Sequence, residues 1–165
     1  MYKLLFKQTL IYGLATVLPR MFSFILVPLY TQVLPVVEYG AVSIIFSWLV
    51  LFNVVLSYGM ETAFFRFYTQ EEDKESVLGT SLISIFWTSI LFLVLGLVYR
   101  HSLAEWSSLD VENITYTVWI LVLDALVVIP FSKLRVQQKP VFYAVLKIIN
   151  VAINLGLNIL FLLIL

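Results

Sequence analysis

The sequence contains no cysteine and a single histidine, and only 12% of its 165 residues are charged. The absence of cysteine excludes a disulfide framework, a thiolate metal site and a cysteine nucleophile. A single imidazole is too few for a histidine-based metal site. An ordinary soluble domain carries about 25% charged residues. The low charge therefore argues against a soluble globular enzyme, and it argues equally against a disordered segment.

What the sequence does contain is apolar: 62% of the residues are hydrophobic and the mean hydropathy is +1.02. A domain of this size cannot bury so much apolar surface, so its solvent is lipid. A membrane-spanning helix needs about 20 mostly apolar residues, and only a helix satisfies its own backbone in hydrocarbon. We predict an all-α membrane helix bundle, a single region whose five spans cover about residues 8–34, 40–65, 76–99, 114–132 and 141–165.

The ten basic and ten acidic side chains give a net charge of zero, which argues against a nucleic-acid partner. Their distribution predicts that the N-terminus is cytoplasmic, because cytoplasmic loops are rich in lysine and arginine. The loops on that side would then hold Lys3, Lys7, Arg66, Lys74, Lys133, Arg135 and Lys139. We therefore expect a multi-pass protein of the cytoplasmic (inner) membrane. The last predicted span runs to Leu165 without a polar tail, which we interpret as the front part of a longer membrane protein.

Four ionisable side chains are predicted at membrane depth, where a charge is costly and marks function by default: Arg20, Glu61, Asp124 and Lys147. Their depths suggest that Arg20 pairs with Asp124 and that Glu61 pairs with Lys147. Such pairs either hold helices in register or serve a transport site, and both interpretations stay open. Arg66, near the membrane boundary, joins Glu61 and Asp124 as a candidate for ion pairing or coupling. For Arg20 we favour a functional role, because prolines in the same span break the helix and broken helices recur beside transport sites.

The last predicted span carries polar side chains on one helical face, at Lys147, Asn150, Asn154 and Asn158. They form either a hydrogen-bonded seam between helices or the wall of a hydrated cavity for a polar cargo. A weaker stripe in the third span favours close packing of small side chains against a neighbouring helix, at Ser81, Ser84 and Thr88. We find no Walker loop, dinucleotide fingerprint or nucleophile elbow. We therefore expect no enzyme activity and no cofactor, and transport that is passive or driven by an ion or a potential.

Several strings of the sequence resemble the bacterial lipid-linked oligosaccharide flippases. These form the polysaccharide-transporter branch of the multidrug, oligosaccharidyl-lipid and polysaccharide exporter superfamily. The strings include KQTLIYGL at 7–14, VPLYT at 27–31, YGMETAFFRF at 58–67, LDAL at 123–126 and KIIN at 147–150. They follow in the right order over nearly the whole chain.

The resemblance implies most of one six-helix lobe of a MATE-like fold with a central cavity. The implied cargo is an oligosaccharide on a polyprenyl diphosphate, flipped across the membrane for lipopolysaccharide or polysaccharide biosynthesis, with Na+ or H+ as a coupling ion. Cationic residues on the cavity wall would bind the anionic head group, and Arg20 and Lys147 match that role, with Asn150 and Asn154 beside them. Two alternatives remain open: a cation-coupled multidrug or small-molecule exporter of the same superfamily, and a small non-transporting membrane subunit.

Overall fold

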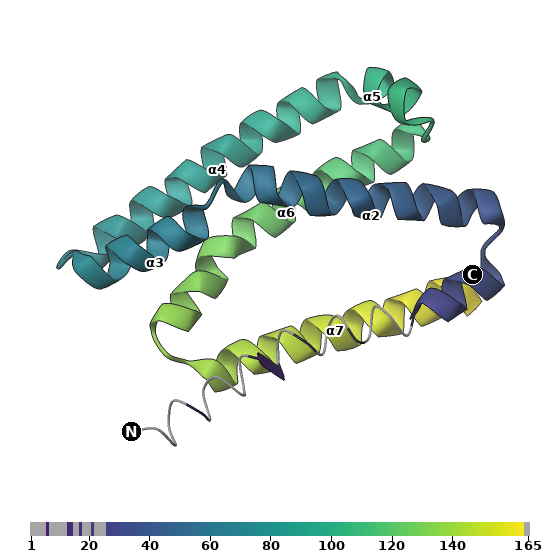
Figure 1. Cartoon of the computed structure of the whole chain (residues 1–165). Helices are drawn as coiled ribbons and strands as arrows, with labels where there is room; N and C mark the ends of the chain where they lie inside the picture. The colour runs from purple at the N-terminus through teal and green to yellow at the C-terminus, as the bar shows by residue number, and fades with distance from the viewer. Residues whose placement is uncertain (1–5, 7–12, 15–16, 18–20, 22–25, 164–165) are drawn as a thin grey trace. The chain divides into compact units, whose positions relative to one another are not determined.

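The apolar segments fold as helices in the computed structural model, which describes residues 6, 13–14, 17, 21 and 26–163. Over these residues the chain forms no strand, and the prediction of an all-α membrane bundle is confirmed. The helices are α2 (Val36–Ser57), α3 (Met60–Gln70), α4 (Lys74–Val98), α5 (Arg100–Ser107), α6 (Val111–Val136) and α7 (Pro140–Leu163) (Figure 1). Residues 26–33 are helical as well. Most of the predicted first span lies outside the described residues.

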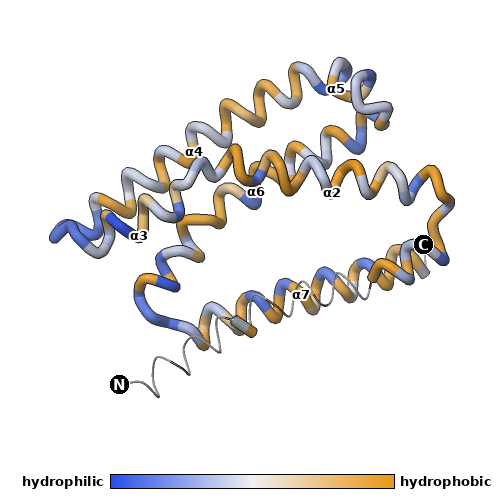
Figure 2. The backbone as a smooth tube through the Cα atoms, viewed as in Figure 1, coloured by the Kyte–Doolittle hydropathy of each residue, from blue (hydrophilic) through white to orange (hydrophobic). Residues whose placement is uncertain are grey.

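Four segments among the described residues are long and apolar enough to cross a membrane: Val36–Gln70, Lys74–Val98, Val111–Val136 and Pro140–Leu162. They correspond to the last four predicted spans. Figure 2 shows the apolar colouring along these helices and polar residues at the α3–α4 turn. Clustering of the backbone divides the chain into two compact units, Gly40–Val136 and a second unit of Met1–Tyr39 with Gln137–Leu165.

The second predicted span is interrupted, which the sequence pattern did not indicate. Tyr58 has φ 32° and Gly59 has φ 71°, so the backbone turns left-handed between α2 and α3. Gly59 serves as the N-cap of α3. The Tyr58 hydroxyl and Ser84 Oγ share a 2.9 Å hydrogen bond that ties this joint to α4. The span from 40 to 65 is therefore two helices with a fixed joint between them.

The predicted loop from Arg100 to Asn113 contains a short helix, α5, and the first residues of α6. The α5 helix ends at Ser107, and its C-cap residue Ser108 is left-handed at φ 57°. At the other end of the unit, α4 begins behind Asp73, whose carboxylate accepts a hydrogen bond from the Ser76 backbone N–H at 3.1 Å. Caps of this kind satisfy backbone donors that have no partner within the helix.

The core of the Gly40–Val136 unit lies around α6. Three clusters of buried side chains involve this helix: one contains Phe64, Ile85 and Ile129, a second contains Ile114 and Val118, and a third contains Leu56, Leu121 and Ala125. The α4 helix buries three small residues, Ser81, Ser89 and Gly96, and Gly96 lies directly against Val118 of α6. Small residues let two helix backbones approach closely, as is usual for helix pairs in membranes.

We expect Gly59→Ala to lower the stability of the folded chain by about 1–2 kcal/mol, the cost of a left-handed conformation for a residue with a Cβ. No neighbouring atom lies within 4 Å of a Cβ at this position, so the loss would come from the backbone alone. Thermal unfolding in detergent measures it. Gly79→Ala is the matched control, because Gly79 also has open space but lies inside α4, where alanine favours the helix. Equal unfolding midpoints for the two variants would contradict the argument.

Candidate functional site

The polar face predicted for the last span is present on α7. Lys147, Asn150, Asn154 and Asn158 all lie within this helix, three or four residues apart, and therefore share one face. Polar residues recur along α7 in Figure 2. Asn150 and Asn154 are exposed, and Lys147 is partly buried. An otherwise apolar helix thus carries a continuous row of hydrogen-bonding groups.

The far part of this row forms a hydrogen-bonded seam. The Tyr30 hydroxyl donates to Asn158 Oδ1 at 2.5 Å, joining residues 26–33 to α7 within one unit. Asn158 Nδ2 donates to the Asn154 carbonyl at 2.8 Å and to Asn154 Oδ1 at 3.0 Å. For Asn158 the contact with Tyr30 is interhelical, whereas the contacts of Asn154 with Asn158 lie within α7. Lys147 and Asn150 lie one to two turns away from this seam.

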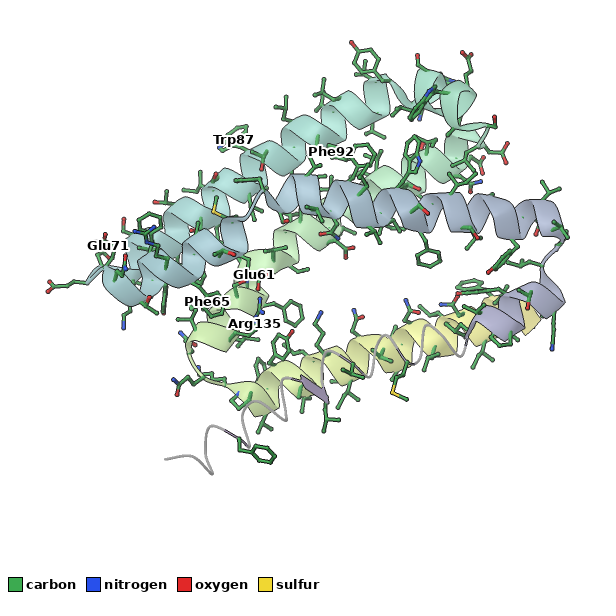
Figure 3. All side chains as sticks on the ribbon, in the orientation of Figure 1. Glu61, Phe65, Glu71, Trp87, Phe92 and Arg135 are labelled. Carbon is green, nitrogen blue, oxygen red and sulfur yellow. The ribbon has the colours of Figure 1, made fainter. Side chains whose placement is uncertain are left out.

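Glu61 pairs with Arg135, a residue that we expected in a loop. Its carboxylate forms an ion pair with the Arg135 guanidinium, and both side chains are partly exposed. The Arg135 guanidinium also lies 5.3 Å from the centre of the Phe65 ring (Figure 3). Because α6 continues to Val136, Arg135 belongs to the last helical turn. Lys147, the partner expected from depth, belongs to the other compact unit, so its pairing with Glu61 stays a prediction.

Asp124 lies midway along α6, as predicted, and its side chain is exposed. Asn53 Nδ2 on α2 donates to Asp124 Oδ2 at 3.2 Å. We did not predict a role for Asn53 from the sequence, although a polar residue in an otherwise apolar stretch is a signal of one. The contact joins α2 to α6 on the α2 side of the Tyr58–Gly59 joint, whereas the Glu61–Arg135 pair joins α3 to α6 on its other side.

Two candidates are not brought into these contacts. Arg20 lies outside the described residues, so its pairing with Asp124 stays a prediction. Arg66 is exposed on α3, five residues beyond the paired Glu61. Among the residues that the structure describes, no group of three histidine, aspartate or glutamate side chains is placed to hold a metal ion. The described polar groups can bind by charge and hydrogen bonding.

Comparison with known proteins identifies the family but no individual relative. No curated protein and no solved structure matches the chain. The family model described as "Polysaccharide biosynthesis protein" matches residues 5–165, which is nearly the whole sequence. The match covers the segments with the joint, the two polar contacts to α6 and the polar face of α7. The chain therefore belongs to the polysaccharide biosynthesis protein family and is a multi-pass membrane protein.

Proposed function

We propose that the chain works in the flipping of an oligosaccharide linked to polyprenyl diphosphate across the cytoplasmic membrane, for lipopolysaccharide or other polysaccharide synthesis. The observation that carries the proposal is the polar face of α7 within a family whose members serve polysaccharide synthesis. Polar side chains on a helix that crosses lipid must meet other polar groups. Asn158 meets Tyr30 within the chain, and a sugar chain on a diphosphate offers such groups to the exposed Asn150.

The chemistry of the candidate residues fits this cargo. A diphosphate is anionic and accepts hydrogen bonds, and guanidinium and ammonium groups bind its oxygens. Lys147 supplies a positive charge on the polar face of α7, and the exposed Asn150 lies about one turn away. Arg20 supplies a second cation by its predicted depth. We infer that Arg20, Lys147, Asn150 and Asn154 contribute to the wall that the head group passes, in a MATE-like lobe that alternates between the two membrane faces.

We further propose that the N-terminus is cytoplasmic and that Na+ or H+ drives the movement. We assign the coupling ion to the carboxylate of Asp124, since this side chain lies at the middle of α6 and is exposed. Glu61 and Arg135 compensate each other's charge. We therefore assign them a structural role in holding α3 to α6.

The proposal is tested in cells by the fate of lipid-linked sugar. We expect Lys147→Ala, like Arg20→Ala, to deplete surface polysaccharide and to trap the lipid-linked precursor on the cytoplasmic face, with the protein present at its normal abundance. Lys139→Ala is the matched control, because Lys139 precedes α7 and lies off its polar face. A protein whose loss sensitises cells to small organic cations, with no trapped precursor, would instead be an exporter.

A further inference from the structure

A cleft of about 480 Å³ lies between α3 and α4, at the end of the unit where these helices are joined. Its volume lies in the range of about 300–1,000 Å³ that is usual for small-molecule sites. The α3 wall is apolar and includes Met60, Phe64 and Phe67. This cleft contains none of the residues assigned above to the flipping of an anionic lipid-linked sugar.

The α4 wall of the cleft is lined by hydroxyl groups, with Thr80, Ser81 and Ser84 one turn or one residue apart. Although the spacing of this stripe favours helix packing, Ser81 and Ser84 line the cleft. The Ser84 hydroxyl is hydrogen-bonded to the Tyr58 hydroxyl. Ser81 is only 8% exposed, and its hydroxyl makes no hydrogen bond within the described part of the chain. Ser81 lines the cleft, and a hydroxyl can both donate and accept, so a polar group of a ligand can hydrogen-bond with it.

The mouth of the cleft is acidic, because Glu71 and Asp73 line it where the chain passes from α3 to α4 (Figure 3 labels Glu71). Asp73 uses Oδ1 to cap α4, which leaves Oδ2 for another contact. The neighbouring cation, Lys74, lies over the Tyr68 ring at 5.8 Å and is not part of the lining. The mouth of the cleft is therefore complementary to a positive charge.

The walls suit an apolar body attached to that charge. Phe67 is 49% exposed and lines the cleft, and aromatic faces attract cations as well as apolar groups. From Asp73 to Ser84 the lining extends over three turns of α4, which is about 16 Å at 1.5 Å per residue. An elongated molecule with a cationic end matches this sequence of an acidic mouth, an apolar wall and a buried hydroxyl.

We propose that the α3–α4 cleft binds an amphiphilic organic cation. Its ammonium group lies at Glu71 and Asp73, its apolar body lies against Met60, Phe64 and Phe67, and the Ser81 hydroxyl contacts its inner end. This chemistry is shared by soluble lipophilic cations and by the amine head group of an aminophospholipid. The site is separate from the polar face of α7.

The test is binding of ethidium to the purified chain in dodecyl maltoside micelles, followed by fluorescence anisotropy. We expect Glu71→Gln combined with Asp73→Asn to weaken binding about tenfold, because two partly exposed charge contacts are lost. Asparagine still caps a helix, and circular dichroism checks that the helices remain. Glu75→Gln is the matched control, since Glu75 lies in the first turn of α4 outside the lining. Ser81→Leu fills the cleft and should also abolish binding.

Competition then identifies the source of the cation. Displacement of ethidium by phosphatidylethanolamine, but not by phosphatidylglycerol, supports a lipid amine, whereas no displacement by either lipid supports a soluble cation. Absence of ethidium binding would overturn the proposal. Equal binding by the double variant and the wild type would overturn it too, as would equal displacement by the anionic lipid.

Discussion

Arg135→Gln is expected to lower the stability of the folded chain by about 1–2 kcal/mol, the sum of a partly exposed ion pair and a cation–π contact. Arg135 forms the ion pair with Glu61 and stacks over Phe65, so one substitution removes two contacts between α3 and α6. The carboxylate of Glu61 would remain at the end of the apolar bundle without its cation. Thermal unfolding in detergent and the protein's abundance in membranes measure the loss.

The double variant Glu61→Gln/Arg135→Gln distinguishes a charge effect from a packing effect. If the stranded carboxylate causes the loss, removing both charges recovers most of the stability, because the two substitutions are not additive when the residues interact. Lys133→Gln is the matched control, as Lys133 is the other cation in the last turn of α6. A double variant as unstable as the sum of the single variants would contradict the assigned role of the pair.

Gly96→Ala is expected to destabilise the chain by about 1–3 kcal/mol, the range for overpacking a well-packed core. A Cβ at Gly96 would lie 2.8 Å from Val118 Cγ2 and 2.9 Å from Val118 Cγ1. Valine is stiff at χ1, so its side chain cannot turn away cheaply and α4 must move from α6. The midpoint of thermal unfolding should fall by several degrees, on the order of 5 °C for a chain of this size.

Two further variants check that this loss arises from the contact itself. Val118→Ala in the Gly96→Ala background removes both clashing methyl groups and should restore part of the stability. Gly79→Ala places the same methyl group at a position of α4 with open space, and it should leave the midpoint unchanged or raise it. If the Gly96→Ala variant and the wild type have the same midpoint of thermal unfolding, α4 and α6 are not closely packed at this position.

The helices could be predicted because their signal is strong. A run such as Ser76–Tyr99 without a charge has one stable form in lipid, and α4 covers Lys74–Val98. The joint at Tyr58–Gly59 could not be predicted in this way, because each flanking stretch is equally helical and only the backbone angles reveal the interruption. The α5 helix was missed for a different reason: it is short and polar, and packing against α6 rather than hydropathy supports it.

The candidate site was predicted one residue at a time, and its contacts were not. Depth along a helix indicates which charged residues share a level, but it does not say which helices are neighbours. The contact of Glu61 with Arg135 was therefore missed, since Arg135 had been placed in a loop beyond the span, and the pairing of Glu61 with Lys147 stays a prediction. Asp124 was also selected, but its contact with Asn53 needs the packing of α2 on α6. The row on α7 was predictable because it depends on spacing within one helix.

The joint between α2 and α3 also resolves a mismatch of length. As one straight helix, Val36–Gln70 with its 35 residues would extend about 52 Å, whereas the hydrocarbon of a bilayer is only about 30 Å thick. The 22 residues of α2 reach about 33 Å and cross it alone. The joint therefore frees α3 from the direction of α2. The α3 helix packs instead along the first half of α4 and the end of α6, where Phe64 contacts the same buried cluster as Ile85 and Ile129.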